Sequence, residues 1–147
     1  MSAPEKRKIY FAGSIRGGRA DVLIYEELVG FLAGFGEVLT SHVGNPDLDA
    51  SGDEGISEDS IYLRDMAWLD EADLVIAEVT TPSLGVGYEI GAAEARGKRI
   101  LCLFRQGGDV SLSAMVAGNP ALCARDYRTL AEAKEYIAEF VRQESGC

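Results

Sequence analysis

Short apolar runs alternate with longer segments of helical spacing along the chain, and this feature constrains the fold most. Strand-like runs cover residues 8–13, 37–43, 73–80, 99–104 and 121–127. Each run is followed by a segment of helical or mixed character. Such alternation is typical of a parallel sheet whose crossover helices cover both faces.

The alternation predicts an α/β fold: one domain over residues 1–147, with a doubly wound, five-stranded parallel sheet of the flavodoxin-like or Rossmann-like class. Residues 73–80 ("DLVIAEVT") are almost continuously apolar, as expected for a central strand covered on both faces. Residues 129–144 carry apolar side chains at helical spacing, which predicts a closing amphipathic helix. The strand order expected for this class is 2-1-3-4-5.

Net charge and hydropathy limit the classes of partner that the chain can bind. The 147 residues carry a formal net charge of −10, from 24 acidic and 14 basic side chains, which argues against nucleic acid as a partner. A small phosphate stays possible, because a few N–H groups and one arginine hold it locally. No run approaches the ~20 apolar residues that span a bilayer, and the N-terminus lacks the apolar stretch of a signal peptide. We therefore expect no membrane partner and a cytoplasmic protein, or a nuclear one in a eukaryotic cell.

Two segments fall outside the expected strands and helices. Residues 1–7 are polar and predict a disordered tail. Residues 44–57 are rich in Gly, Asp, Ser and Pro, which predicts a mobile loop. Ser57 would cap the helix that follows this loop, with Ser60 as the alternative.

The cysteines predict no metal centre. Cys102, Cys123 and Cys147 are far apart, and their spacing is not that of metal ligands. Cys102 and Cys123 lie in strand-like runs, so we expect buried, reduced thiols. With a single histidine in the chain, the sequence predicts no metal and no other cofactor.

Two glycine-rich segments follow the first and third strands. They are "GSIRGG" (residues 13–18) and "TTPSLGVGYE" (residues 80–89). In a sheet of order 2-1-3-4-5, ligands bind outside the carboxyl ends of these two strands, where the strand order reverses. The sequence thus predicts a site between the two segments.

The first segment has the chemistry of an anion-binding turn. Its glycines allow close backbone approach, Ser14 offers a hydroxyl, and Arg16 and Arg19 offer positive charge. The spacing matches neither the dinucleotide fingerprint nor the P-loop. A tight structural turn and a phosphate-binding loop are both open at this point.

The second segment is the stronger candidate, because Ser83 sits where a helix is expected to begin. A helix N-terminus presents unpaired N–H groups and partial positive charge. Gly85 and Gly87 in the first turns cost ~1 kcal/mol each relative to alanine. A closely approaching ligand, or close packing against the first strand, would compensate.

Four side chains are candidates for chemistry at this crevice. Glu89, near the start of the same helix, would project over it, or be an ordinary solvated glutamate. Glu78, late in an apolar run, is either a crevice residue or an acid paired with a neighbouring base. Asp65 stands at the edge of an apolar helical stripe and could face the rim of the sheet. His42, just past the second strand, is a ligand contact or a structural histidine.

Five stretches together resemble the nucleoside 2-deoxyribosyltransferase family. They are "YFAGSIRGGR", "VLTSHV", "RDMAWLDEADLVIAEVTTPSLGVGYEIG", "KRILCLFR" and "LSAMV". The resemblance runs from about residue 10 to about residue 116. It points to the branch that hydrolyses the N-glycosidic bond of 2'-deoxynucleoside 5'-monophosphates, a purine nucleotide such as dGMP being favoured. Residues 44–56 and the N-terminal segment depart from the family pattern.

The resemblance implies a role for each matching residue. Glu89 matches the nucleophile, Asp65 an acid near the sugar and base, and Tyr10 a tyrosine that contacts the catalytic carboxylate. Ser113 matches a serine that reaches the phosphate from the partner subunit of a homodimer. The full set of expected substrate-binding residues is Gly13, Ser14, Ile15, Arg16, Gly17, Gly18, Arg19, His42, Ser83, Gly85 and Ser113.

The expected reaction is a double displacement without cofactor, in which Glu89 attacks the sugar, the base departs and water completes hydrolysis. Rival functions are a deoxyribosyltransferase with a second base as acceptor, a ribonucleotide hydrolase and a non-catalytic nucleotide-binding module. A flavodoxin-like electron carrier is a further alternative, but only the fold class supports that hypothesis.

Overall fold

The computed structural model describes residues 6–49, 51–52 and 55–147, which contain a parallel sheet in the order β2-β1-β3-β4-β5. The predicted fold class and strand order are confirmed. The strands are β1 (Arg7–Ala12), β2 (Gly36–Val38), β3 (Leu74–Glu78), β4 (Arg99–Arg105) and β5 (Cys123–Tyr127).

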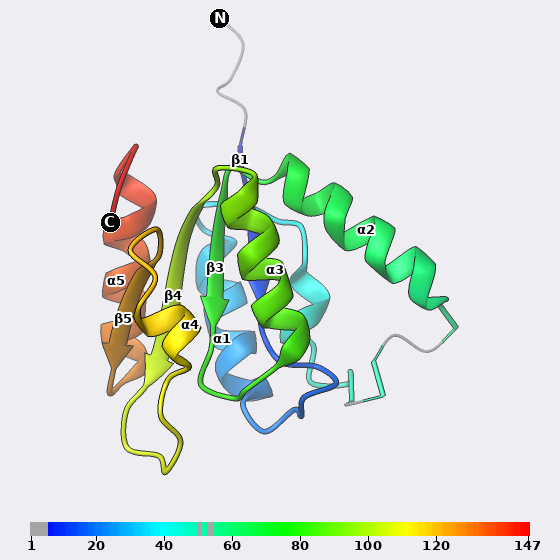
Figure 1. The fold of residues 1–147 in the computed structure, drawn as a ribbon, viewed down its shortest axis with the longest axis horizontal. Coiled ribbons are helices and arrows are strands. Elements are labelled where there is room, and N and C mark those ends of the chain that lie inside the picture. The colour runs from blue at the N-terminus through cyan, green and yellow to red at the C-terminus, as the bar shows by residue number, and fades with distance from the viewer. Residues whose placement is uncertain (1–5, 50, 53–54) are drawn as a thin grey trace, which may run out of the picture.

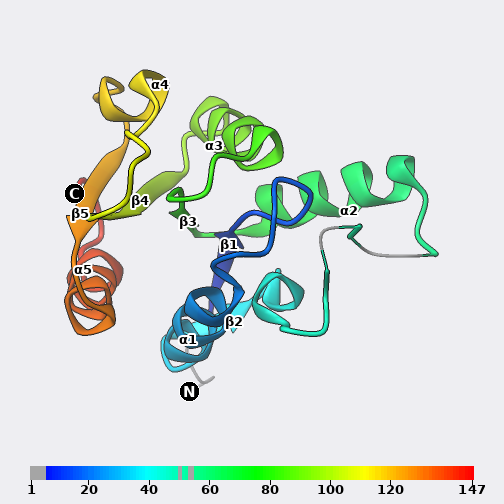
Figure 2. The ribbon, with the colours of Figure 1, turned by 90° about the horizontal axis from the view of Figure 1, so that it is seen from below.

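Helices cover both faces of this sheet (Figure 1, Figure 2). One face carries α1 (Val22–Leu32) and α5 (Leu130–Arg142), and the other carries α2 (Glu58–Glu71), α3 (Leu84–Ala95) and the short α4 (Ala114–Ala117). Three of the helix starts are set by side-chain caps: Ser57, Ser83 and Thr129 each accept the N–H three residues on. The expected cap at Ser57 is confirmed.

The period of two along β1 divides its side chains between two cores. Ile9 and Phe11 are buried with α1 and α5, whereas Tyr10 and Ala12 are buried with α2 and α3. Every residue of β3 is buried, as its continuous apolar run predicts. This alternation brings Tyr10 to the face on which α3 carries Glu89.

The second strand is shorter than predicted. β2 ends at Val38, and residues Ser41–Gly44 form the 3-10 helix η1 in place of the expected strand residues. The Thr40 side chain explains the change, because its hydroxyl accepts the Phe11 N–H at 2.8 Å and donates to the Phe11 carbonyl at 2.6 Å. These bonds take over backbone groups that would pair with a longer β2.

The two segments expected to be disordered or mobile are only partly within the described residues. Arg7 belongs to β1, so the tail is shorter than predicted, and residues 1–5 lie outside the described part. Residues 50, 53 and 54 of the expected loop are also outside it. The mobility of the loop stays a prediction.

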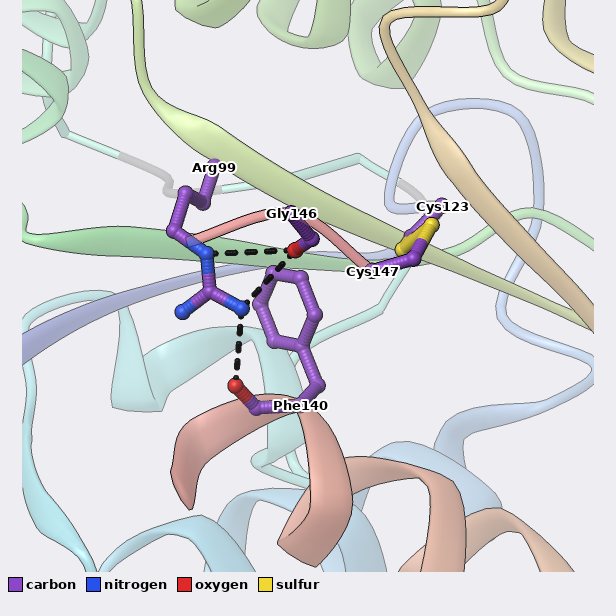
Figure 3. Close-up of a disulfide and its surroundings, with 5 residues drawn as sticks. All are labelled: Arg99, Cys123, Phe140, Gly146 and Cys147. Carbon is purple, nitrogen blue, oxygen red and sulfur yellow. Dashed lines mark hydrogen bonds between the residues drawn. A yellow bond between two sulfur atoms is a disulfide. The ribbon is translucent and has the colours of Figure 1, made fainter. Parts of the chain in front are cut away.

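The expectation of buried, reduced thiols is confirmed for Cys102 and wrong for Cys123. Cys123 and Cys147 form a disulfide with a Cα–Cα distance of 5.3 Å, whereas Cys102 is free and buried (Figure 3). Arg99 holds the C-terminal segment near β5 by donating to the carbonyls of Phe140, Gln143 and Gly146. Because these are long-range backbone contacts, cysteine spacing alone could not indicate the pair.

Among the described residues, no helix is both long and apolar enough to cross a membrane.

Candidate active site

A cavity of about 610 Å³ lies at the carboxyl ends of β1 and β3, where the strand order reverses. The loop after β1, the α3 N-terminus and one side of α2 form its walls. Nine of the expected site residues line it: Gly13, Ile15, Arg16, Gly17, His42, Asp65, Ser83, Gly85 and Glu89.

The loop after β1 packs directly onto the start of α3. A Cβ at Gly17 would lie 2.8 Å from the Pro82 carbonyl oxygen and 3.3 Å from the Ser83 Cα, so the backbones meet too closely for a side chain. Arg16 extends across the cavity mouth to Glu58, at 3.3 Å. The glycine-rich turn thus forms one wall of the cavity with α3.

Four expected site residues from the β1 side, one catalytic and three substrate-binding, do not line the cavity. Tyr10 and Ser14 are buried beneath its walls, and Gly18 has a φ of 123°, which serves the turn. The Arg19 guanidinium donates to the carbonyls of Ser14, Val43, Asn45 and Leu48 at 2.8–3.0 Å. Arg19 therefore ties the expected mobile loop to the β1 turn.

The α3 N-terminus forms the rest of this wall. Ser83 accepts the Val86 N–H at 3.3 Å, and its own hydroxyl hydrogen stays available as a donor. A Cβ at Gly85 would lie 4.0 Å from both Ser83 Oγ and Glu89 Oε1, so this glycine keeps the space between hydroxyl and carboxylate open. Helix N-terminal N–H groups and their dipole favour an anion here. For Gly87, the structure shows neither close packing nor a cavity role.

Glu89 projects from α3 into the cavity and contacts the Tyr10 side chain. Burial raises the pKa of Glu89 to about 7, the negative charge of Asp65 raises it too, and the Tyr10 hydrogen bond lowers it. Burial and both carboxylates hold the pKa of Tyr10 well above its ordinary value, so the hydroxyl stays a donor to Glu89. A carboxylate in this setting is reactive near neutral pH.

Asp65 lies on α2 in an ion pair with its neighbour. Arg64 Nε is 3.0 Å from Asp65 Oδ1, and both side chains are mostly buried. The Arg64 guanidinium lies 4.8 Å from the Trp68 ring centre and 3.4 Å, through Nη2, from His42 Nε2. His42 thus belongs to a cationic and aromatic group at one end of the cavity, away from the α3 N-terminus.

Sequence reasoning missed several lining residues of α2 and α3. Tyr62 and Tyr88 form an edge-to-face pair at 6.3 Å at the cavity mouth, and Arg64 lines the wall. The helical spacing of Ile61, Asp65 and Trp68 could have indicated Arg64, since residues three or four apart share one face.

Two further candidates, Ser113 and Glu78, do not line the cavity. Ser113 caps α4 and lies outside the cavity of its own chain. Glu78 is fully buried behind the cavity, where it accepts the Thr80 N–H at 2.6 Å and the Tyr127 hydroxyl at 2.8 Å. Both expectations for Glu78 are therefore wrong: it neither lines the crevice nor pairs with a neighbouring base.

The described residues contain no group of three or more His, Cys, Asp or Glu side chains able to hold a metal ion. The chemistry of the cavity is that of two carboxylates, a tyrosine hydroxyl and a helix N-terminus. Together with the doubly wound sheet, these groups define the class: an α/β protein with a glycosidase-type carboxylate pair beside an anion site.

Comparison with known proteins places the chain in a family. The family model described as nucleoside 2-deoxyribosyltransferase matches residues 9–139, and the chain belongs to this family. The resemblance seen in the sequence is thereby confirmed.

Several named relatives are about half identical to this chain. The 5-hydroxymethyl-dUMP N-hydrolase of Esox lucius is 51% identical over 125 residues, covering 82% of this chain and 86% of that protein. The human 5-hydroxymethyl-dUMP N-hydrolase is 53% identical over 116 residues, covering 78% and 67%. The putative 2'-deoxynucleoside 5'-phosphate N-hydrolase 1 of Trichoplax adhaerens is 49% identical over 113 residues, covering 77% and 76%.

A solved structure shares the fold. The Clostridium botulinum CMP N-glycosidase BcmB superposes with a TM-score of 0.64 at 22% sequence identity, covering 90% of this chain and 99% of that one. At this identity the likeness concerns the fold alone.

Proposed function

We propose that this protein hydrolyses the N-glycosidic bond of 2'-deoxynucleoside 5'-monophosphates, giving a free base and 2-deoxyribose 5-phosphate. The observation that carries the proposal is the position of Glu89. Its carboxylate lies in the cavity between the α3 N-terminus, Tyr10 and Asp65. The names of relatives about 50% identical to the chain support the same reaction.

The phosphate is assigned to the wall made by the loop after β1 and the start of α3. Ser83 donates its hydroxyl hydrogen there, and the N–H groups of the first α3 turn add partial positive charge. Polar groups left unpaired in the absence of a phosphate cost about 1–3 kcal/mol each, so nucleosides should bind more weakly than nucleotides. The remaining contacts expected of Ile15, Arg16 and Gly17 belong to the same wall.

The reaction runs as a double displacement on C1'. Glu89 forms a C1'–O bond as the C1'–N bond breaks, and the bonding electrons leave with the base. Asp65 delivers or directs the proton that the departing base takes up. Water then attacks C1', Glu89 is released, and one water molecule is consumed per turnover. Tyr10 orients Glu89 throughout.

The base is assigned to the part of the cavity lined by His42 and Arg64, which both lie against the Trp68 ring. The relatives' names point to 5-hydroxymethyl-dUMP, while the sequence motifs favoured a purine nucleotide such as dGMP. Both nucleotides are therefore test substrates. The cytoplasm is the proposed location, on the same hydropathy grounds as before.

A homodimer completes the proposed site, with Ser113 reaching the phosphate of the neighbouring subunit. Large apolar side chains stand exposed on the same face: Leu63 on α2 (66%), Leu84 on α3 (95%) and Met115 on α4 (82%). Exposed apolar groups on one face favour an interface. Sedimentation at micromolar concentration tests the dimer, and a monomer would contradict it.

The decisive experiment measures free base by chromatography after incubation with 5-hydroxymethyl-dUMP and dGMP, with GMP and deoxyguanosine alongside. The expected result is base release from the deoxynucleotides and its loss in Glu89→Ala. Binding of dGMP without base release would overturn the proposal in favour of a nucleotide-binding module.

Transfer to a second base is the rival reaction, and the family's name favours it. Excess adenine added to the same incubation distinguishes the two. A new adenine deoxynucleotide would identify a transferase, whereas unchanged release of the first base would identify a hydrolase.

A further inference from the structure

A second group of polar side chains, two buried and two half-buried, lies outside the proposed catalytic machinery. It consists of Asp21, Tyr25, Thr81 and Arg105, and we call it the Asp21 cluster. Asp21 is 6% exposed and Tyr25 is fully buried. None of the four residues lines the cavity.

Asp21 stands at the N-cap of α1, but its carboxylate does not cap the helix. It accepts the Thr81 hydroxyl at 2.9 Å through Oδ2 and Arg105 Nη2 at 2.9 Å through Oδ1. A side chain suited to capping is thus used for long-range contacts with the segment after β3 and with the end of β4.

Tyr25 connects the cluster to the loop after β1. Its hydroxyl accepts the Ser14 N–H at 3.2 Å, and the Thr81 side chain lies close enough to lower the Tyr25 pKa. Next to Thr81, the Thr80 hydroxyl accepts the Arg105 N–H at 2.8 Å. The cluster therefore holds both segments of the proposed phosphate wall: Ser14 in one, Thr81 in the other.

The two segments also contact each other directly, since Gly17 packs against the Pro82 carbonyl. A shift of residues 80–82 would move Ser83 and the start of α3, which follow directly in the chain. Polar recognition depends on donor positions within a few tenths of an ångström, and misplacement by 1 Å weakens it strongly.

We propose that Thr81 and Asp21 are positioning residues for phosphate binding: their hydrogen bond holds Ser83 and the α3 N-terminus in register with the loop after β1. This inference rests on the proposed function, because it assumes that the phosphate occupies that wall. Neither residue touches the substrate.

The test uses a pair of variants at Thr81. Thr81→Val keeps the shape but removes the hydroxyl, and Thr81→Ser restores it. Thr129→Val is the matched control, because it deletes a threonine hydroxyl that caps α5, far from the cavity. Thermal melting of all three variants measures the loss of stability common to Thr81→Val and Thr129→Val.

Two readouts separate positioning from stability. In steady-state kinetics, Thr81→Val should raise the KM for the deoxynucleotide about fivefold to tenfold, as expected for one lost hydrogen bond, with kcat within about twofold of wild type. In calorimetry, the Kd for 2-deoxyribose 5-phosphate should rise by the same factor. Thr81→Ser should restore both values, and Thr129→Val should change neither.

Other outcomes would overturn the inference. Equal KM and Kd values in wild type and Thr81→Val would remove Thr81 from phosphate binding. A fall in kcat without a change in Kd, or equal effects in Thr81→Val and Thr129→Val, would reduce the cluster to general stability.

The calorimetric arm distinguishes this inference from the proposed function. If wild type binds 2-deoxyribose 5-phosphate but releases no base, the proposed hydrolysis fails and the inference is still decided by Kd. If wild type neither binds this ligand nor releases base, both fail together, and if it releases base without binding this ligand, the KM values decide the inference.

Discussion

Glu89 and Glu78 are two acids in similar surroundings at the carboxyl side of one sheet, and they differ in a single respect. Burial raises the pKa of both, and each is hydrogen-bonded to a tyrosine: Glu89 to Tyr10, Glu78 to Tyr127. Glu78 is fully buried, and its two oxygens accept from the Thr80 N–H and the Tyr127 hydroxyl. Glu89 opens into the cavity beside Asp65 and Arg64.

The difference shows that burial and a tyrosine partner do not by themselves make a catalytic acid. In Glu78, neighbouring donors satisfy both oxygens and no space remains for a ligand. In Glu89, the same desolvation leaves one side of the carboxylate facing open space. Access to the cavity, rather than a raised pKa, separates the proposed nucleophile Glu89 from the buried Glu78.

The largest expected effect is on turnover at Glu89. Glu89→Gln removes the nucleophile and should lower kcat by about a thousandfold or more. Glu78→Gln should change kcat less than about fivefold while lowering Tm, because it disturbs a buried hydrogen-bonded acid. Both variants are measured by base release and by thermal melting. A greater loss of kcat in Glu78→Gln than in Glu89→Gln would contradict the distinction drawn between the two glutamates.

Asp65 should give the next largest effect. Asp65→Asn removes the group that handles the base's proton and should lower kcat about a hundredfold. The assay compares nucleotides whose bases differ in leaving ability, and the poorer leaving group should lose most. Asp126→Asn, at an exposed acid on β5, is the control and should leave turnover unchanged. A uniform loss across all bases would remove Asp65 from proton delivery.

The two tyrosines sharpen the comparison at smaller magnitude. Tyr10→Phe should lower kcat about tenfold and shift the pH profile to higher pH, since the Tyr10 hydrogen bond lowers the Glu89 pKa. Tyr127→Phe leaves a buried carboxylate oxygen unpaired and should cost about 1–3 kcal/mol of stability with normal turnover. pH–rate curves and melting temperatures measure both. An unshifted pH profile in Tyr10→Phe would contradict the assigned contact.

The smallest effect is a pH dependence of stability caused by Glu89. Its folded pKa of about 7 exceeds the ordinary 4.5, so the folded state binds more protons in this window, and stability falls as pH rises through it. Glu89→Gln should therefore raise Tm by several degrees at pH 8 and not at pH 4. Over the same range, kcat/KM of wild type should rise, because the nucleophile must be ionised. A pH-independent difference in Tm would contradict the raised pKa.

Local and periodic features were readable from the sequence. The apolar run of residues 73–80, the spacing in α5 and the caps at Ser57 and Ser83 each follow from interactions within a few residues. The site's location followed as well, because the strand order decides which loops meet. The motif match supplied Glu89, Asp65 and Tyr10 as a set.

Contacts between segments distant in the sequence were decided only by the tertiary structure. Thr40 ends β2 because its side chain hydrogen-bonds to the Phe11 backbone. Arg19, expected to contact the ligand, instead connects two loops by hydrogen bonds. Cys123 forms a disulfide with Cys147. Each depends on packing that brings together residues at least 24 positions apart. The sequence by itself determined the fold class and the acid set. Only the three-dimensional arrangement decided that Glu89 faces open space while Glu78 is fully buried, because access depends on how all neighbouring segments pack.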